Sequence, residues 1–194
     1  MQFDFVIVGA GSAGCALANR LSEDGRYTVA LIEAGPRDTS PWIHIPVGYF
    51  RTMGNPKMDW CYETQEDAGI ANRSIPWPRG RVLGGSSSIN GLLYVRGQTQ
   101  DYDGWAQMGC TGWSWSDVLP YFKRSETWEG ADQTGLRGKS GPLSVQNSRL
   151  TRDVVDKWVD AAVDAGYKRN PDYNGADQEG VGYFQLTMKG GRRC

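Results

Sequence analysis

Three glycines follow a short apolar run near the start of the sequence. The run Phe5-Val6-Ile7-Val8 leads into Gly9-x-Gly11-x-x-Gly14, and residues 15–21 then show helical apolar spacing. In a strand–turn–helix unit the first glycine permits the tight turn, the second lets a pyrophosphate approach the backbone, and the third lets the helix pack closely on the strand. The free N–H groups and the positive end of that helix would face the phosphate.

A carboxylate stands where such a site would need one. Residues 27–32 are apolar and β-branched, which predicts a second, parallel strand, and Glu33 follows it. An acid about 20 residues after the last glycine accepts the ribose hydroxyl of adenosine and repels a 2′-phosphate, so NADP is disfavoured. The pattern does not separate NAD from FAD. The competing interpretation is a glycine-rich turn beside an exposed glutamate, without a ligand.

A second glycine-rich segment occupies residues 78–97. Gly84 and Gly85 would let the chain pass very close to a neighbouring group, and three serine hydroxyls at positions 86–88 could supply donors. Asn90 adds a fixed amide ahead of an apolar stretch. This combination suits a second contact with the same large cofactor, and an ordinary polar loop is the alternative.

Composition limits the class of protein. The chain has 194 residues, of which 26 are glycine, 39% are apolar and 22% are charged, so it is neither disordered nor of low complexity. The net charge of -1 gives no reason to expect a nucleic-acid partner, and no apolar run is long enough for a membrane span. The start of the sequence lacks the features of a secretory signal, and the four cysteines form no Cys-x-x-Cys pair. We expect reduced cysteines, with Cys15 buried, in a cytoplasmic protein.

The segment between the glycine-rich regions reads as irregular. Prolines recur through residues 35–79, which predicts extended backbone with few helices. His44 is the only histidine and stands in an apolar context without an adjacent acid or hydroxyl. We therefore favour a structural role for His44 over a catalytic one, because a general base usually has an orienting partner.

The C-terminal part predicts one helix, a turn and a strand. Thr151 is expected to cap a helix over residues 152–165 that ends at Gly166. Its predicted apolar face consists of Val155, Trp158, Val159 and Ala162. Residues 172–175 have turn chemistry and residues 182–187 have strand character. The tryptophans at 105, 113, 115 and 158 are expected to pack in cores and interfaces, because no basic surplus accompanies them.

The second glycine-rich segment resembles the first signature of the glucose-methanol-choline (GMC) oxidoreductase family. The match runs from Gly80-Arg81-x-Leu83-Gly84-Gly85-Ser86-Ser87-x-Ile89-Asn90 through Tyr94 and Gly97 to Asp103. Residues 101–105 and 112–122 are also similar to the family, whose choline-dehydrogenase-like branch is the nearest. The resemblance extends over essentially the whole chain.

This resemblance implies FAD as the cofactor and oxidation of an alcohol by hydride transfer to flavin N5. Carried over residue by residue, it implies pyrophosphate contacts at Gly9, Gly11, Ser12, Ala13 and Gly14, and adenosine contacts at Glu33 and Ala34. It implies contacts on the flavin side at Val82, Ser86, Asn90, Gly91, Leu92 and Leu93, and further cofactor contacts at Arg81 and Gly85. Relatives that attach FAD covalently have a histidine where this chain has Ile89, so FAD is expected to be non-covalent.

The resemblance also implies what this chain does not supply. The family's catalytic base is a histidine, paired with a second histidine or an asparagine, and that pair is expected outside this chain. We expect an α/β fold with a Rossmann-like βαβ start at residues 3–35, an irregular cofactor-covering segment, and the beginning of an α+β substrate domain. Residues 1–145 would form the N-terminal part of the FAD-binding domain, with the signature at 80–103, and residues 146–194 would open the substrate domain.

Several alternatives remain at this stage. The missing remainder would come from the same polypeptide or from a second, complementary one. The chain could be a non-catalytic FAD-binding fragment, or part of a same-family hydroxynitrile lyase or light-driven fatty-acid decarboxylase. A pyridine-nucleotide dehydrogenase is the weakest option, because it leaves the second glycine-rich segment without a role. The substrate, the electron acceptor and the oligomeric state are not encoded in these residues.

Overall fold

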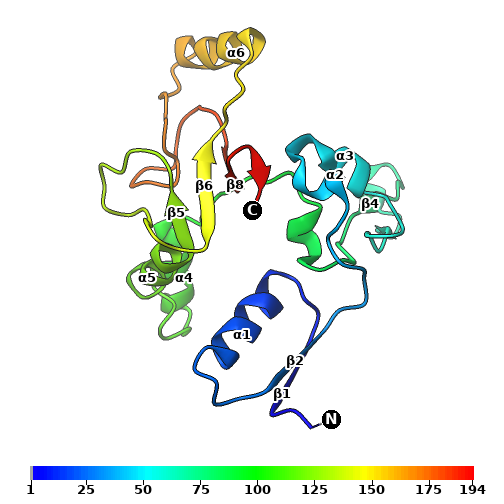
Figure 1. Cartoon of the computed structure of the whole chain (residues 1–194). Helices are drawn as coiled ribbons and strands as arrows, with labels where there is room; N and C mark the ends of the chain where they lie inside the picture. The colour runs from blue at the N-terminus through cyan, green and yellow to red at the C-terminus, as the bar shows by residue number, and fades with distance from the viewer. Residues whose placement is uncertain (1) are drawn as a thin grey trace. The chain divides into compact units, whose positions relative to one another are not determined.

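The structure, a computed structural model, describes residues 2–194 (Figure 1). By their contacts these residues form two units: residues 2–92 together with Arg193, and Leu93–Arg192 together with Cys194. Each unit is described by itself below. The domain boundary predicted after residue 145 falls inside the second unit and stays a prediction.

The first unit opens with the expected strand, helix and parallel strand. These are β1 (Phe5–Val8), α1 (Ser12–Ser22) and β2 (Val29–Ile32), with β1 and β2 parallel from Phe5↔Val29 to Val8↔Ile32. The second strand is shorter than the predicted 27–32. Thr28 instead donates from its N–H and its hydroxyl to the Asp4 carboxylate, at 2.7 and 2.8 Å. The predicted α/β start is confirmed.

Short elements fill the rest of the first unit. They are α2 (Pro41–His44), η1 (Pro46–Gly48), α3 (Tyr49–Thr52), β3 (Tyr62–Glu63), η2 (Ala68–Ile70), β4 (Pro76–Trp77) and η3 (Gly85–Ser88). The prediction of irregular backbone is therefore too simple between residues 41 and 52. Proline occupies a first-turn position in both α2 and η1, where its fixed φ favours a helix and its missing N–H costs nothing.

A small apolar core holds these segments together. Ile43, Met58, Val82 and Ile89 form one buried cluster, with Met53 packed against it. The cluster joins α2 and the loop before β3 to the second glycine-rich segment, through Val82 before Gly84 and Ile89 after it. It thereby fixes the backbone of that segment.

The second unit contains three helices and a small mixed sheet. Its helices are α4 (Thr99–Gln107), α5 (Trp115–Ser125) and α6 (Asp153–Asp164). Its strands are β5 (Glu126–Trp128), β6 (Leu143–Asn147), β7 (Gln185–Leu186) and β8 (Met188–Lys189), and β9 (Arg192–Arg193) ends at the residue grouped with the first unit. The sheet order is β5-β6-β7, with β5 parallel and β7 antiparallel to β6.

The C-terminal helix was only partly predicted. The N-cap of α6 is Arg152 and no side chain caps it, so the capping role given to Thr151 is wrong. Of the predicted apolar face only Val159 is buried, whereas Trp158 is 64% exposed. The predicted strand at 182–187 is reduced to β7, Gln185–Leu186. Trp105 and Trp113, by contrast, meet edge to face with ring centroids 6.0 Å apart.

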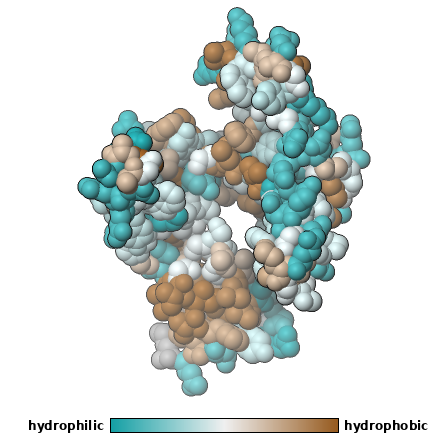
Figure 2. All heavy atoms as spheres, turned by 180° about the vertical axis from the view of Figure 1, so that it is seen from behind, coloured by the Kyte–Doolittle hydropathy of each residue, from teal (hydrophilic) through white to brown (hydrophobic). Residues whose placement is uncertain are grey.

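The β1–β2 pair carries an exposed apolar face. Val6, Val8 and Ile32 are exposed on one face of the pair, Val8 by 84%. Figure 2 shows apolar side chains gathered at the lower end of the view, where β1 and β2 lie. Parallel sheets are ordinarily covered on both faces, so this face is of the kind that further protein covers. No helix within residues 2–194 is long and apolar enough to cross a membrane.

Candidate cofactor site

The first glycine-rich turn has the geometry that its spacing predicts. Gly9 has a φ of +95°, and its N–H donates to the Ile32 carbonyl at 2.7 Å, which ties the turn to β2. A Cβ on Gly14 would lie 1.9 Å from the Gly9 carbonyl oxygen. No side chain fits at that distance, so the predicted role of Gly14 in close helix–strand packing is confirmed.

The N-terminus of α1 is open for an anion. The first intrahelical hydrogen bond runs from Cys15 N–H to the Gly11 carbonyl at 2.9 Å, so the N–H groups of residues 12–14 have no acceptor within the helix. No side chain caps Gly11 and the first turn of α1 contains no acid. Unneutralised helix N-termini of this kind bind phosphates. The Gly-rich turn therefore fits a pyrophosphate.

Cys15 lies just inside this helix and differs from its prediction. The side chain is half-buried rather than buried. Its Sγ lies 3.3 Å from the Ala10 carbonyl and donates to it. The thiol thus contributes to the shape of the turn.

Glu33 is held rigidly beside the turn. One carboxylate oxygen, Oε2, accepts a hydrogen bond from Ala10 N–H at 2.8 Å, and Oε1 accepts one from Gly35 N–H at 3.0 Å. The side chain is half-buried. Each carboxylate oxygen has two lone-pair sites, so both can accept a further donor such as a ribose hydroxyl.

The second glycine-rich segment lies directly against the first. Gly84 N–H donates to the Ala10 carbonyl at 2.7 Å, and Gly11 and Gly84 form a parallel bridge. A Cβ on Gly85 would lie 2.8 Å from the Cα of Gly11, where there is no room for it. The close approach predicted for Gly84 and Gly85 is confirmed, and the neighbouring group is the first turn. Both segments therefore form one continuous backbone surface.

The serines of this segment mostly serve the loop itself. The Ser87 hydroxyl donates to the Gly84 carbonyl at 2.6 Å and the Ser88 hydroxyl to the Leu83 carbonyl at 2.8 Å. Ser86 Oγ instead accepts from Gly80 N–H at 3.0 Å, which leaves its O–H proton able to donate. The expectation of three available hydroxyl donors is thus corrected to one, because two are used to fold the loop.

Arg81 and Val82 hold the segment through their neighbours. The Arg81 guanidinium lies over the Trp60 ring, 5.4 Å from its centroid, and donates to the Pro56 carbonyl at 3.2 Å. The Arg81 carbonyl packs so closely on Gly35 that a Cβ there would lie 1.9 Å away. Val82 is fully buried in the apolar core. The side chains of these residues therefore fix the loop beside Glu33 and Ala34.

Asn90 has a fixed orientation. Its Oδ1 accepts from Leu92 N–H at 3.0 Å and from Arg193 Nη1 at 2.7 Å. Leu92 has a φ of +65°, a conformation that non-glycine residues adopt at a cost and that often marks a functional segment. Gly91 has open space where its Cβ would be. Arg193 was not predicted from the sequence, because nothing in its neighbourhood signals a contact with Asn90.

The predicted cofactor residues from Gly9 to Leu92 all belong to the first unit, whereas Leu93 belongs to the second. The structure thus brings the pyrophosphate, adenosine and most flavin-side candidates onto one body. Leu93 pairs with Leu186 in an isolated bridge within the second unit.

His44 makes a local structural contact. Its Nε2 lies 2.8 Å from the Asp38 carbonyl oxygen, and the Asp38 carboxylate is 4.0 Å away. The sequence suggested no acid beside His44, because Asp38 stands six positions before it. Among residues 2–194 no group of three or more His, Cys, Asp or Glu side chains could hold a metal ion.

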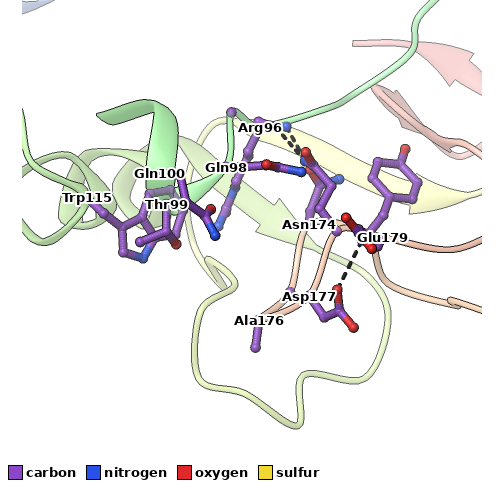
Figure 3. A pocket seen from close by; sticks show the side chains of 13 residues that line it. Arg96, Gln98, Thr99, Gln100, Trp115, Asn174, Ala176, Asp177 and Glu179 are labelled. Carbon is purple, nitrogen blue, oxygen red and sulfur yellow. Dashed lines mark hydrogen bonds between the residues drawn. The ribbon is translucent and has the colours of Figure 1, made fainter. Parts of the chain in front are cut away.

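The second unit has a polar pocket of its own, with a volume of about 210 Å³ (Figure 3). Two hydrogen bonds shape its wall: Arg96 N–H donates to Asn174 Oδ1 at 2.7 Å, and Glu179 N–H donates to Asp177 Oδ1 at 3.0 Å. None of the predicted cofactor residues lines this pocket.

Comparison with curated proteins finds close relatives. The chain is 48% identical over 193 residues to the oxygen-dependent choline dehydrogenase of Rhizobium johnstonii, a match that covers 100% of this chain and 35% of that protein. The chain thus spans about a third of the length of the curated relatives it matches.

Solved structures share the fold. Pyridoxine 4-oxidase from Mesorbium loti matches with a TM-score of 0.92 and 37% identity, covering 99% of this chain and 38% of that one. An FAD-dependent oxidoreductase from Chaetomium thermophilum matches with a TM-score of 0.86 and 33% identity, covering 97% of this chain and 34% of that one. The GMC oxidoreductase family model matches residues 3–194. Because that match spans nearly every residue, the chain belongs to the GMC oxidoreductase family.

Proposed function

We propose that this chain forms the FAD-binding part of an oxidoreductase that oxidises the CH–OH group of a small-molecule alcohol. FAD is the cofactor that membership of this family implies. The observation that carries the proposal is the hydrogen bond from Gly84 N–H to the Ala10 carbonyl. It joins both glycine-rich segments into one surface at the N-terminus of α1.

Each part of this surface has a proposed task. The N–H groups of α1 and the turn Gly9–Gly14 bind the pyrophosphate, and Glu33 with Ala34 holds the adenosine ribose. Asn90 and the residues around it border the flavin, together with Arg81, Val82, Gly85, Ser86, Gly91, Leu92 and Leu93. The chemistry that bound FAD supplies is acceptance of a hydride from the alcohol carbon.

We further propose that FAD is bound without a covalent link. Ile89 carries no nucleophilic atom, and its side chain is only 2% exposed within the apolar core. The side chain at this position therefore cannot attack the cofactor. The proposal is supported by this chemistry alone.

The catalytic base is proposed to lie outside these residues. His44 bonds the Asp38 carbonyl, and the chain corresponds to 35% of a choline dehydrogenase relative. The exposed apolar face of β1 and β2 supports a covering polypeptide, either the rest of a longer chain or a second one. The names of the relatives, a choline dehydrogenase and a pyridoxine oxidase, support a small alcohol as substrate. We propose a cytoplasmic location, which suits four cysteines without a disulfide among the described residues.

A second candidate function is an FAD-binding fragment without turnover. It is favoured by the single histidine, whose ring nitrogen is engaged with backbone. Any alcohol oxidation by the purified 194-residue chain would exclude this candidate.

The first experiment is a visible absorption spectrum of the purified chain, with and without added FAD, followed by acid precipitation. We expect a flavin spectrum that moves entirely to the supernatant. Flavin retained in the precipitate would contradict non-covalent binding. No flavin binding at any FAD concentration would contradict the proposed cofactor site in this chain.

A matched pair of variants ties the result to the turn. Gly14→Ala places a Cβ 1.9 Å from the Gly9 carbonyl, whereas Gly104→Ala in α4 meets nothing within 4 Å. We expect the first to abolish FAD binding and the second to leave it unchanged. Anaerobic bleaching of the flavin by alcohols, in a full-length protein containing this chain, then tests the reaction.

A further inference from the structure

Arg193 is buried in the first unit with every contact made to oxygen. Arg193 is only 7% exposed. Nε donates to the Ile43 carbonyl at 2.8 Å, Nη1 to the Ser87 carbonyl at 2.8 Å and to Asn90 Oδ1 at 2.7 Å, and Nη2 to the Asn90 carbonyl at 2.7 Å. These four bonds fix the guanidinium in one plane against the second glycine-rich segment.

The charge of this guanidinium has no carboxylate partner among the described residues. All four acceptors are neutral, and no ion pair of Arg193 with an Asp or Glu occurs within residues 2–194. Burial lowers the pKa of Arg193 below its ordinary value, yet arginine stays protonated at neutral pH. An unpaired buried charge costs free energy, which makes this guanidinium a candidate for a role beyond packing.

Arg193 also settles which way the Asn90 amide points. Two N–H donors, Leu92 N–H and Arg193 Nη1, converge on the same side-chain atom, which must therefore be the oxygen. The Nδ2 group then points the other way. Asn90 is exposed, and Nδ2 makes no hydrogen bond to any of the described residues. This exposed donor is available to a ligand.

We propose that Arg193 is a positioning residue for the flavin: it directs Asn90 Nδ2 at the cofactor and places an uncompensated positive charge on the flavin side of the site. The inference rests on the proposed function, in which Asn90 borders the flavin. It adds a consequence for redox chemistry. A fixed positive charge favours the reduced cofactor, which carries more negative charge, over the oxidised one.

A purely structural Arg193 would behave differently. If it served only to fasten α2 to the loop at 87–90, its replacement would loosen the fold without changing the relative affinity for oxidised and reduced FAD. The midpoint potential of the bound flavin separates the two roles, because it depends on that ratio alone.

The test compares three variants of the full chain with the wild type. Arg193→Met removes the charge at similar length, Arg193→Lys keeps the charge and loses the planar fork, and Arg192→Met removes the exposed neighbouring charge as a matched control. FAD affinity is measured by flavin fluorescence titration, and the potential by equilibration with reference dyes.

We expect Arg193→Met to weaken FAD binding about tenfold and to lower the preference for reduced FAD about tenfold, which is about 30 mV for a two-electron couple. Arg193→Lys should keep the wild-type potential with weaker FAD binding, and Arg192→Met should change neither quantity. A wild-type potential in Arg193→Met would overturn the inference while leaving the proposed function intact. A wild-type chain that binds no FAD would overturn both.

Asn90→Asp provides a second route if Arg193→Met does not fold. The new carboxylate keeps the acceptors for Leu92 N–H and Arg193, removes the Nδ2 donor, and neutralises the guanidinium. We expect weaker FAD binding and a potential lowered in the same direction as in Arg193→Met. An unchanged potential in Asn90→Asp, with the fold preserved by circular dichroism, would refute the inference.

Discussion

Gly84 donates its backbone N–H to the carbonyl oxygen of Ala10 at 2.7 Å, and in the same turn Ala10 donates its own N–H to the Glu33 carboxylate at 2.8 Å. Ala10 thus links the family signature to the acid at the end of β2 through its two backbone groups. On the side facing the protein, the backbone groups of Ala10 already have hydrogen-bond partners. The N–H groups at the N-terminus of α1 remain for the ligand.

Gly85→Ala should damage this junction. The added Cβ would lie 2.8 Å from Gly11 Cα, and the φ of +59° at this position costs a non-glycine residue about 1–2 kcal/mol. We expect a loss of stability of at least that size and weaker FAD binding, measured by urea unfolding and flavin fluorescence. Gly25→Ala, at a φ of +71° and with nothing within 4 Å of the added Cβ, is the control. Equal stability of the two variants would contradict the close contact.

Glu33→Gln should weaken both the turn and the cofactor site. The carboxylate accepts from Ala10 N–H and Gly35 N–H, and the glutamine amide would set a donor against one of them. An unsatisfied buried donor costs about 1–3 kcal/mol. Glu23→Gln, on the exposed end of α1, should lose far less. FAD titration of both variants at matched fold content checks the prediction, which fails if they bind alike.

Asp59 predicts a specific pH dependence of stability. Burial alone would raise the pKa of this carboxyl, but hydrogen bonds from the backbone N–H groups of Cys61, Gly54 and Arg79 outweigh it and hold the pKa below its ordinary value. The unfolded chain therefore binds the proton more readily than the folded one. This contribution is complete above the unfolded pKa of about 4 and is lost as the pH falls through the folded value.

Asp59→Asn isolates that contribution. At neutral pH we expect a loss of about 1.5–3 kcal/mol, the usual size for hydrogen bonds to a charged group. The difference from the wild type should shrink as the pH is lowered below about 4, because the unfolded aspartate takes up a proton there before the folded one does. Urea unfolding at both pH values provides the measurement, with the exposed Asp24→Asn as control. A difference that does not depend on pH would refute the assignment.

Glu126→Gln should destabilise the second unit strongly. Glu126 is fully buried and pairs with Arg96 at 2.5 Å and with Arg137 at 2.5 Å. Removing one partner of a buried pair typically costs about 3–5 kcal/mol, because the remaining charge is left uncompensated. The exposed pair of Asp160 and Arg169 offers the control Asp160→Asn, for which about 0–1 kcal/mol is expected. Thermal unfolding measures the loss of stability in both variants. Similar losses would argue against a special role of the buried network.

The glycine-rich elements were predictable because they rest on local rules. The run at residues 5–8, the spacing to Gly14 and the acid at position 33 each act within one strand–turn–helix–strand unit, and β1, α1 and β2 follow them. The family signature could be recognised for the same reason, because it also lies within one short stretch of sequence. Neither pattern, however, says that the two segments touch each other.

Contacts across long sequence separations were not predictable. The bond between Arg193 and Asn90, and the ion network around Glu126, depend on how distant segments meet. The capping of α6 was misjudged by one residue, because the helix begins after Arg152 and no side chain caps it. Exposure of Trp158 was missed because helical spacing predicts an apolar face but not what covers it.

The bond between Arg193 and Asn90 sets an order of events during biosynthesis. The two residues are 103 positions apart, so at the usual elongation rate the ribosome adds Arg193 about 5–20 s after Asn90. Throughout that interval the amide of Asn90 lacks the guanidinium that orients it. The nascent βαβ unit can therefore fold early, while the flavin-side loop reaches its final form only when translation has passed Arg193. Loading with cofactor on the ribosome, if it begins at the pyrophosphate end, would have to finish after that point.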